Sequence, residues 1–357
     1  MKHVLVYGMT DNPGGIETYL LNFYRRVQGN GIKLDFVSDF PSISGSDILT
    51  ERGSNLYFIP AKSRDLKTHL MDMWKILREH REYESVYFNI LDAGAAVTML
   101  PVFLAGRKII VHSHNNDTEK MRLHRLCKPF LNFMAGGRAA CSESAAEYMF
   151  GKGAKKTLII PNAIDAKKFA FSEELREQKR QELGLGDRPC ICHVGRIAPQ
   201  KNPFGLIDIF EAVHRSCPEA VLLSVGDGEL MGEFRQYIAD KGLENSVICL
   251  GARKDVPELY QAADVFLLPS LYEGLGIVAL EAQAAGLPCV ISDTIPRCVA
   301  VTDLVSMISL DAGPNVWAER ILMQLGKPRK DSYREIVAAG YDVSCCSDCD
   351  QKLVDLF

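Results

Sequence analysis

Short apolar runs alternate along the chain with longer segments in which apolar residues recur at helical spacing. The short runs predict β-strands at residues 3–7, 34–37, 55–59, 85–90, 108–112, 139–142, 157–160, 190–194, 221–225, 247–250, 265–268 and 289–292. Helical patterns separate most of them, for example at residues 16–27, 67–81, 203–215 and 277–285. Strands that alternate with helices predict βαβ units, and continuously apolar strands are typical of parallel sheets covered on both faces. The pattern therefore predicts an α/β fold.

This pattern occurs twice, and a polar, charged stretch at residues 165–188 separates the two occurrences. We therefore predict a domain boundary near residues 165–168 and two Rossmann-like, doubly wound domains that face each other across a cleft. In such domains ligands bind at the carboxyl ends of the strands.

Composition narrows the class of protein. The 357 residues carry a net charge of −4, and 47% are hydrophobic and 24% charged, which is typical of an ordinary globular protein and gives no support to nucleic-acid binding. No apolar run reaches the roughly 18 residues that a membrane-spanning helix needs. The 11 cysteines lie scattered in apolar stretches without a recognisable secretory signal, so we expect no disulfide framework and a cytoplasmic location.

Two candidate sites follow strands of the first half. After the first strand comes Asp11-Asn12-Pro13-Gly14-Gly15-Ile16-Glu17, where glycines and the start of a helix would suit an anion, although a plain strand-to-helix turn has the same features. After the strand at 108–112 comes His112-Ser113-His114, where a histidine could bind a hydroxyl or phosphate or exchange a proton. A metal site and a simple strand end are the alternatives for this histidine pair.

The second half carries two further candidates. Arg196 and Lys201 lie on the loop that follows the strand at 190–194, and two cations there would suit a diphosphate unless the loop is merely a solvated basic one. Glu273 and Glu281 are separated by seven residues, with glycines directly after the first. The backbone amides of Leu275, Gly276 and Ile277 would open a helix and hold a phosphate, while the carboxylates would take hydroxyls. A helix-dipole role explains one glutamate but not both.

Three further features can be interpreted either as structural or as functional. Residues 119–134 combine basic and apolar side chains at helical spacing, so this helix either packs on its own domain with a solvated face or contacts an anionic membrane. Asp348-Cys349-Asp350 resembles a metal-binding D-x-D motif but follows no predicted strand. Cys345, Cys346 and Cys349 include only one C-x-x-C pair, so core packing or surface thiols are favoured over a metal site.

Taken together, these motifs resemble the retaining glycosyltransferases of family 4, which have the GT-B fold, over nearly the whole chain. The residues that carry the resemblance are Gly14-Gly15-Ile16-Glu17, His112-Ser113-His114, Asn162-Ala163-Ile164-Asp165, Gly195-Arg196 with Lys201-Asn202, Gly226-Asp227-Gly228-Glu229, and Glu273 with Glu281. The stretch that begins at Glu281 is similar to that of bacterial capsular and exopolysaccharide enzymes. The resemblance implies an acceptor domain at residues 1–165, a donor domain at 166–332, and a terminal helix at 333–357 that returns to the first domain.

The resemblance also implies a role for each site residue. Arg196 and Lys201 would bind the diphosphate of a nucleotide sugar, expected to be a UDP-sugar. Glu273 would hold the hydroxyls of the transferred sugar, and Glu281 would hold the ribose. His114 would contact the transferred sugar near the reacting centre. The remaining donor-binding residues would be Gly15, Gly274, Leu275, Gly276, Ile277 and Arg253.

The implied reaction transfers a hexose or N-acetylhexosamine, with retention and without a metal or other cofactor, to a saccharide or lipid-linked acceptor in cell-surface polysaccharide synthesis. We expect no nucleic-acid partner, and peripheral contact with an anionic membrane remains an open interpretation. Two alternatives also stay open: a nucleotide-sugar 2-epimerase and a non-catalytic nucleotide-sugar binding protein.

Overall fold

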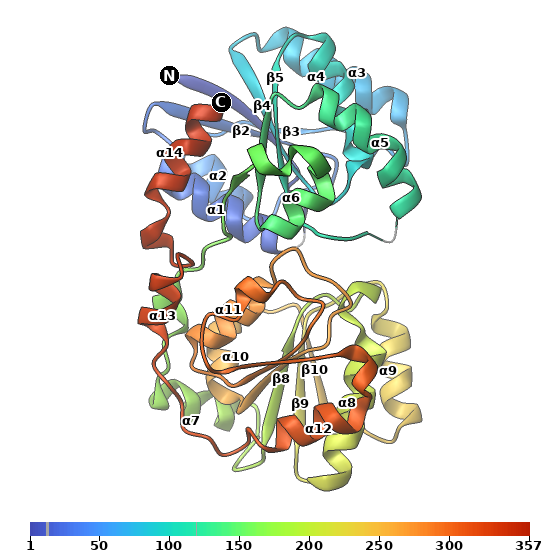
Figure 1. Cartoon of the computed structure of the whole chain (residues 1–357), viewed down its shortest axis with the longest axis vertical. Helices are drawn as coiled ribbons and strands as arrows, with labels where there is room; N and C mark the ends of the chain where they lie inside the picture. Colours follow the sequence, from blue (N-terminus) through green and yellow to red (C-terminus); the bar gives the residue numbers. More distant parts are fainter. Residues whose placement is uncertain (12–13, 119) are drawn as a thin grey trace. The chain divides into compact units, whose positions relative to one another are not determined.

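Two parallel β-sheets organise the chain, each in its own unit (Figure 1). Unit 1 comprises Met1–Ala163 together with Cys345–Phe357, and unit 2 comprises Ile164–Ser344. The structure is a computed structural model that describes residues 1–11, 14–118 and 120–357.

The sheet of unit 1 has the strand order β3-β2-β1-β4-β5-β6-β7, and all of its strands are parallel. Its strands are β1 (Lys2–Tyr7), β2 (Ile32–Ser38), β3 (Leu56–Phe58), β4 (Tyr83–Ile90), β5 (Lys108–Ser113), β6 (Gly137–Ala140) and β7 (Leu158–Ile159). The interior strand β1 places Val6 beside Phe36 of β2 and Tyr87 of β4, and all three side chains are buried. Burial on both faces explains why these strands are continuously apolar in the sequence.

Helices connect and cover the strands of unit 1. They are α1 (Gly15–Val27), α2 (Ser46–Glu51), α3 (Leu66–Glu79), α4 (Ala96–Leu104), α5 (Met121–Met134), α6 (Glu143–Phe150) and, from the end of the chain, α14 (Ser347–Leu356). The short 3₁₀ segments η1 (Ala93–Ala95) and η2 (Gly151–Lys156) precede α4 and follow α6.

The end of the chain is fastened to unit 1 by packing and by charge, and Figure 1 shows α14 in red there. The ring of Phe357 lies 5.2 Å from that of Tyr87, and Arg26 pairs with Asp350 at 2.5 Å. Lys2 Nζ donates to the Val354 carbonyl at 2.7 Å. The predicted single terminal helix at 333–357 is wrong in detail, because α13 (Tyr333–Ala338) belongs to unit 2 and only the segment from Cys345 onward joins unit 1.

The sheet of unit 2 has the strand order β10-β9-β8-β11-β12-β13 and is also parallel throughout. Its strands are β8 (Cys190–Val194), β9 (Val221–Val225), β10 (Val247–Gly251), β11 (Val265–Leu268), β12 (Cys289–Ser292) and β13 (Val305–Ile308). Its other helices are α7 (Glu173–Glu182), α8 (Pro203–Ser216), α9 (Met231–Asp240), α10 (Val256–Ala262), α11 (Ile277–Ala284) and α12 (Pro314–Leu322).

Every segment predicted as a strand overlaps a strand of the structure, whereas β13 was not predicted. In both sheets the direction of strand addition reverses beside the first strand, between β1 and β4 in unit 1 and between β8 and β11 in unit 2. Such switch points open a crevice at the carboxyl ends of the two strands. Among the described residues, no helix is both long and apolar enough to cross a bilayer.

Candidate active site

Lys201 and Glu273 meet at the switch point of unit 2. Lys201 lies on the loop that follows β8, and Glu273 lies on the loop that follows β11, which pairs with β8. The Lys201 ammonium contacts the Glu273 carboxylate in an ion pair, with side chains only 15% and 8% exposed. The structure therefore joins two of the predicted site residues, 72 positions apart, into one buried pair.

The carboxylate of Glu273 has two further partners. Ser270 Oγ donates to Glu273 Oε1 at 2.7 Å, and Gln200 Nε2 lies 3.5 Å from Oε2. Gln200 also donates to the Tyr272 carbonyl at 3.0 Å, which ties the two loops together. A buried carboxylate with a cation and a hydroxyl on the same oxygen is held in one orientation.

Asn202 turns the backbone directly after Lys201. Its φ of 54° is in the left-handed region, and it is the only described non-glycine residue with a positive φ. Asn202 Oδ1 accepts from the Gly205 amide at 3.3 Å and so caps α8, while its Nδ2 donates to the Pro269 carbonyl at 3.2 Å. These bonds fix the loop that carries Lys201 against the end of β11.

Gly195 is closely packed against Lys201 and His193. A Cβ at Gly195 would lie 3.2 Å from Cδ and Cε of Lys201 and 3.3 Å from His193 Nε2. On its other side, a Cβ at Gly226 would lie 2.0 Å from the Gly195 carbonyl oxygen. The backbones of the loops after β8 and β9 are thus in contact, so only glycine fits at Gly226, whereas a side chain at Gly195 would have to displace the Lys201 stem or the His193 ring by a few tenths of an ångström.

His193 is a neighbour of this site that the sequence analysis did not single out. Its Nδ1 lies 3.0 Å from the Leu267 carbonyl, so Nδ1 carries the proton and Nε2 the lone pair. Burial lowers the pKa of His193 to about 4, and the nearby charge of Lys201 adds to this effect. Nε2 has no hydrogen-bond partner among the described residues. The only signal in the sequence was a polar residue at the penultimate position of an otherwise apolar strand.

The start of α11 presents backbone amides beside the pair. Gly276 precedes the helix with a φ of 85°, and no side chain caps this end. A Cβ at Gly276 would lie 3.2 Å from Ile295 Cγ2. The predicted amide donors of Leu275, Gly276 and Ile277 therefore lie where the positive end of the helix dipole favours an anion.

Glu281 lies one turn further along α11, with different partners from those of Glu273. The Tyr260 hydroxyl lies 3.2 Å from both Glu281 Oε2 and the Val278 carbonyl. Burial raises the pKa of Glu281 to about 7, and the hydrogen bond from Tyr260 opposes this shift. No cation contacts Glu281 among the described residues, so its carboxyl group titrates near neutrality.

The other two predicted cations of unit 2 have partners of their own. One guanidinium nitrogen of Arg196 lies 3.2 and 3.0 Å from the oxygens of Glu229, and the Arg196 side chain is 62% exposed. Arg253 binds both carboxylate oxygens of Asp255 at 2.7 Å. This contact is the largest of those that lower the pKa of Asp255. Neither arginine contacts the pair of Lys201 and Glu273 among the described residues, so their donor-binding roles stay predictions.

His114 of unit 1 lies at the end of β5, next to the switch point of its own sheet. Its Nε2 lies 2.9 Å from Asn89 Oδ1, and its ring lies 4.0 Å from that of His112 and 5.3 Å from that of Tyr19. Burial lowers the pKa of His114 to about 3. The ring is therefore neutral near pH 7, and the buried Nδ1 has no hydrogen-bond partner in the described part of the chain.

Gly15 begins α1 directly after the predicted anion loop, of which Asn12 and Pro13 lie outside the described residues. Glu17 folds back onto this loop, where it accepts from the Thr10 amide and the Thr10 hydroxyl at 2.9 Å each. Burial raises the pKa of Glu17. The carboxylate thus holds the loop after β1 in place.

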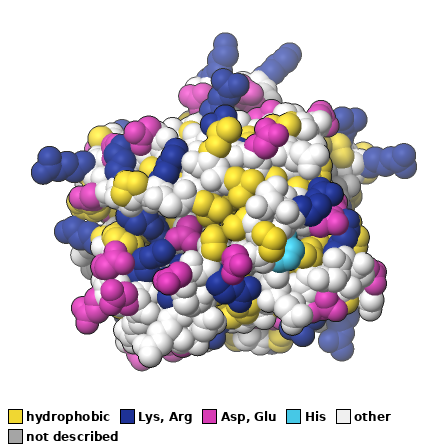
Figure 2. All heavy atoms as spheres, turned by 90° about the horizontal axis from the view of Figure 1, so that it is seen from below, with side chains coloured by type: hydrophobic (Ala, Val, Ile, Leu, Met, Phe, Trp, Pro, Cys, Tyr) yellow, Lys and Arg dark blue, Asp and Glu magenta, His cyan; other side chains and the backbone are white. Residues whose placement is uncertain are grey.

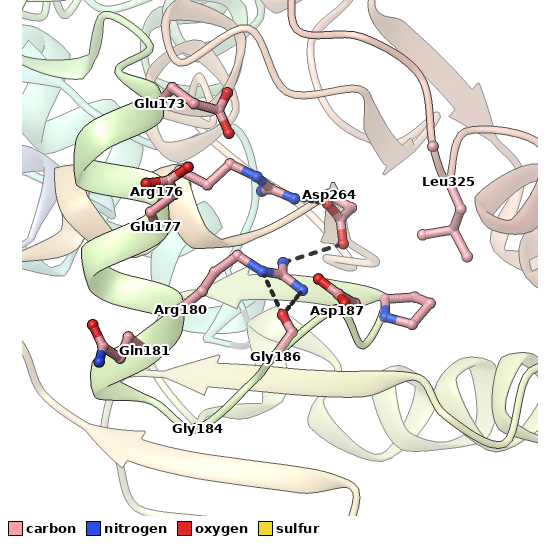
Figure 3. Close-up of a pocket in the computed structure, with 12 residues that line it drawn as sticks. Glu173, Arg176, Glu177, Arg180, Gln181, Gly184, Gly186, Asp187, Asp264 and Leu325 are labelled. Carbon is pink, nitrogen blue, oxygen red and sulfur yellow. Dashed lines mark hydrogen bonds and ion pairs between the residues drawn. The ribbon is translucent and has the colours of Figure 1, made fainter.

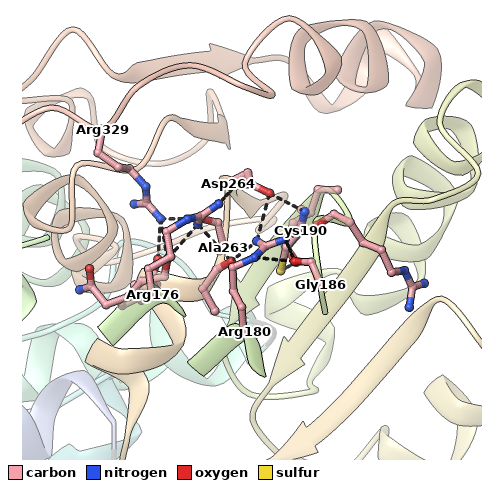
Figure 4. A network of polar contacts seen from close by, with 12 residues as sticks. Arg176, Arg180, Gly186, Cys190, Ala263, Asp264 and Arg329 are labelled. Carbon is pink, nitrogen blue, oxygen red and sulfur yellow. Dashed lines mark hydrogen bonds and ion pairs between the residues drawn. The ribbon is translucent and has the colours of Figure 1, made fainter. Parts of the chain in front are cut away.

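A cavity of about 800 Å³ lies at the opposite ends of β8 and β11 (Figure 3). Arg176, Arg180 and Asp264 line it, and Figure 4 shows that the two arginines and Arg329 point at backbone carbonyls and at Asp264. Arg176 Nη1 donates to the carbonyls of Gln261, Ala262 and Ala263 at 3.0, 3.3 and 2.8 Å. Cations that cap the carboxyl end of α10 in this way are structural. Within the charged stretch at residues 165–188, which separates the two predicted domains, Arg176 and Arg180 therefore hold α7 against the rest of unit 2.

The acids of the D-x-D motif have cationic partners. Asp350 pairs with Arg26 at 2.5 Å, and Asp348 pairs with Lys352 at 2.9 Å. Among the described residues no group of three or more His, Cys, Asp or Glu side chains has an arrangement that could hold a metal ion. The pairing of both acids favours a structural role for this segment.

Comparison with known proteins places these features in a family. Residues 175–341 match the family described as glycosyl transferases group 1, and residues 13–168 match glycosyltransferase family 4. A Bacillus subtilis protein that carries the name glycosyltransferase EpsF is 32% identical over 350 residues, which cover 93% of this chain and 90% of that protein. An Escherichia coli UDP-Gal:alpha-D-GlcNAc-diphosphoundecaprenol alpha-1,3-galactosyltransferase is 31% identical over 257 residues, or 66% of each chain.

Solved structures share the fold. The Anabaena protein Alr3699/HepE, in complex with UDP and glucose, aligns with a TM-score of 0.82 at 22% identity and covers 99% of this chain and 98% of its own. Staphylococcus aureus TarM aligns with a TM-score of 0.76 at 13% identity over 100% of this chain and 99% of its own. Together with the two family matches and the near full-length similarity to EpsF, these alignments show that the chain belongs to the family 4 glycosyltransferases with the GT-B fold.

Proposed function

We propose that this glycosyltransferase moves a hexose or N-acetylhexosamine from a UDP-sugar, with retention of configuration, to a saccharide or lipid-linked saccharide in the synthesis of a cell-surface polysaccharide. Two similar proteins support the choice of substrates. The Escherichia coli relative uses a UDP-sugar and a diphosphoundecaprenol-linked acceptor, and the Anabaena neighbour was solved with UDP-glucose.

One observation carries the proposal: the buried pair of Lys201 and Glu273 lies at the switch point of unit 2, beside the uncapped start of α11. A departing nucleoside diphosphate gains negative charge as the bond to the sugar breaks. A nearby cation and a row of backbone amides stabilise that charge without reorganising, which is the largest contribution to catalysis in many enzymes. Lys201 and the amides of Leu275, Gly276 and Ile277 would supply this stabilisation.

The remaining residues would position the donor. Glu273 would accept hydrogen bonds from the hydroxyls of the transferred sugar, and Glu281 would bind the ribose. Arg196 would exchange its exposed contact with Glu229 for the diphosphate, which is plausible in energy because exposed ion pairs contribute only about 0–1 kcal/mol.

Other contacts with the donor would come from the loop that follows β10 in unit 2 and from unit 1. Arg253 would line the base pocket, and Gly15 would approach the diphosphate. His114 would contact the transferred sugar as a neutral imidazole.

The proposed reaction needs no metal and no cofactor, because cations and helix termini would neutralise the diphosphate. We do not assign Glu273 as a covalent nucleophile, since its carboxylate contacts Lys201 and Ser270. In the proposed mechanism the departing phosphate accepts the proton of the attacking hydroxyl, on the face from which the donor bond breaks.

A panel of UDP, GDP and ADP, alone and as sugars, tests the donor by thermal shift, and product analysis by NMR tests the reaction. Stabilisation by UDP and its sugars, followed by transfer to a saccharide acceptor with the anomeric configuration kept, would support the proposal. Conversion of the nucleotide sugar into its 2-epimer without an acceptor would favour the epimerase. Binding without turnover on any acceptor would favour the non-catalytic alternative.

A further inference from the structure

Helix α5 turns its larger apolar side chains toward solvent. Leu126, Phe130 and Phe133 are 68%, 64% and 77% exposed, whereas the side that packs inward carries His124, Cys127 and Leu131. A helix that only covered its own domain would have the reverse arrangement. The exposed side of α5 is therefore the apolar one.

Helix α4 extends this apolar surface. Phe103 at its end lies against Phe133 of α5, with ring centroids 5.6 Å apart. The helices lie next to each other in unit 1 (Figure 1). The α4–α5 patch consists of the exposed side chains Leu100, Phe103, Leu104, Leu123, Leu126, Phe130 and Phe133. Exposed apolar patches of this kind mark interaction surfaces.

Cationic side chains lie on α5 beside the patch and on the segment that follows α6. Arg122 and Arg125 are exposed on the same side of α5. Lys128 donates to the Tyr148 carbonyl and so joins α5 to the end of α6, after which η2 carries three further exposed lysines, Lys152, Lys155 and Lys156. In the sequence, residues 100–134 contain six Lys and Arg against two Asp and Glu, although the whole chain has a net charge of −4. Among the described residues, the exposed acids nearest to α5 along the chain are Glu143 and Glu147 of α6.

The face shown in Figure 2 offers a contrast. Apolar side chains are exposed near its centre, but cationic and anionic side chains both lie around them. A mixed border of this kind has no preference for an anionic partner, whereas the exposed charged side chains of α5 itself, Arg122 and Arg125, are both cationic.

We propose that the α4–α5 patch docks the protein on the surface of a lipid bilayer that contains anionic headgroups. The exposed leucines and phenylalanines would enter the boundary between headgroups and acyl chains, and Arg122 and Arg125 would lie at the lipid phosphates. A second copy of the chain is a poorer occupant, because a two-fold interface would bring the same arginines face to face. The proposal goes beyond the transfer reaction and does not depend on the donor or the acceptor.

Vesicle co-sedimentation of the full chain tests the proposal without any nucleotide sugar. One set of vesicles contains phosphatidylcholine alone, and the other contains equal parts of phosphatidylcholine and phosphatidylglycerol. We expect binding to the anionic vesicles only, weakened by salt. Binding should fall at least about tenfold in Phe130→Ala/Phe133→Ala and in Arg122→Glu/Arg125→Glu.

Matched control variants change exposed apolar and cationic side chains of unit 2, outside the α4–α5 patch. Leu175→Ala/Met323→Ala truncates two exposed apolar residues of unit 2, and Lys327→Glu/Arg334→Glu reverses two exposed cations there. Both should bind anionic vesicles as the wild type does. Because all the changed side chains are exposed, thermal midpoints should stay near that of the wild type.

A Phe133→Trp variant reports insertion directly, since its emission should shift to the blue on anionic vesicles. Three results would overturn the proposal: no sedimentation of the wild type, equal binding by the variants and the wild type, or no emission shift. A concentration-dependent dimer that Phe130→Ala/Phe133→Ala abolishes would assign the patch to a second copy instead. Any of these leaves the donor chemistry untouched, because binding is measured without donor.

Discussion

Replacing Lys201 with Met separates the charge of the lysine from its packing. The methionine side chain still fills the space beside Gly195 and His193, where the lysine stem lies, but carries no cation. If Lys201 stabilises the departing diphosphate, turnover should fall about 10²–10³-fold, as for the loss of one preorganised electrostatic donor. The same change leaves Glu273, only 8% exposed, without its cation.

The loss of folding stability can be estimated from the contacts of Glu273. Removing one partner of a buried ion pair costs about 3–5 kcal/mol. Ser270 and Gln200 still donate to the carboxylate, so we expect a loss of about 2–3 kcal/mol in the free energy of unfolding. Urea denaturation measures this loss, and initial rates of UDP release in the presence of acceptor measure the turnover.

A second substitution distinguishes the two effects. Adding Glu273→Gln to Lys201→Met removes the unpaired charge, so stability should recover while activity stays low. Lys241→Met is the matched control, because Lys241 pairs with Asp208 and Glu211 at the surface of unit 2, away from the strand ends of the site. Wild-type turnover in Lys201→Met, or recovery of activity together with stability in the double variant, would refute the electrostatic role.

Three further predictions follow from the buried groups. Burial raises the pKa of Glu281 from 4.5 to about 7, so ionisation of this group lowers the free energy of unfolding by up to about 3 kcal/mol as the pH rises through that range. In urea denaturation, Glu281→Gln should therefore be stabilised relative to the wild type more at pH 8 than at pH 5. An equal gain at both pH values would contradict the pKa shift. Burial lowers the pKa of His114 from 6.5 to about 3, so the stability that is present above pH 6.5 is lost as the pH falls, by about 2 kcal/mol at pH 5. His114→Gln should therefore lose less stability than the wild type between pH 7 and pH 5. An identical loss of stability in the variant and the wild type would argue against the pKa shift. Arg329→Met removes the side-chain donor to the Ala285 carbonyl and one of the two arginine donors to the Ala263 carbonyl, which keeps Arg176, so it should cost about 2 kcal/mol with the turnover of the folded fraction unchanged. A reduced turnover per folded molecule would show that the arginine cluster of Figure 4 contributes to the site.

The strands could be predicted where both faces are buried. Strands β8, β9, β11 and β12 are buried at every position, and the predicted bounds match the observed ones. Strand β13 is half-buried throughout and contains Ser306, so its sequence carries no comparable apolar run. Burial rather than intrinsic preference made the pattern visible.

From the sequence it could be predicted that Lys201 and Glu273 lie near each other, but not that they form an ion pair. Both residues follow strands, and the carboxyl ends of parallel strands share one edge of a sheet. The partner of Arg196 could not be foreseen in this way, because Glu229 lies on the loop after a third strand, β9, where several polar residues compete. Which of two nearby acids takes a given cation depends on loop geometry that the sequence pattern does not encode.

The same limit explains helix α5. Its composition and spacing predicted an amphipathic basic helix, but periodicity does not say which face turns inward. In the structure His124 and Lys128 lie on or beside the inward side, because they bond to the Ala93 amide and the Tyr148 carbonyl at the ends of neighbouring segments. Satisfying these polar groups fixed the rotation of the helix and left the phenylalanines outside.

The two glutamates of the E-x7-E pattern are chemically distinct despite their identical side chains. Glu273 contacts a cation and a hydroxyl, so its oxygens can only accept further hydrogen bonds. Among the described residues, the side-chain partner of Glu281 is the Tyr260 hydroxyl, and burial raises the pKa of Glu281 to about 7, so near neutral pH its carboxyl group takes both the charged form and the protonated form, which can also donate. Ribose hydroxyls both donate and accept, so they suit either state of Glu281. In the proposed function Glu273 would hold the hydroxyls of the transferred sugar, and its contacts with Lys201 and Ser270 would fix the carboxylate for that role.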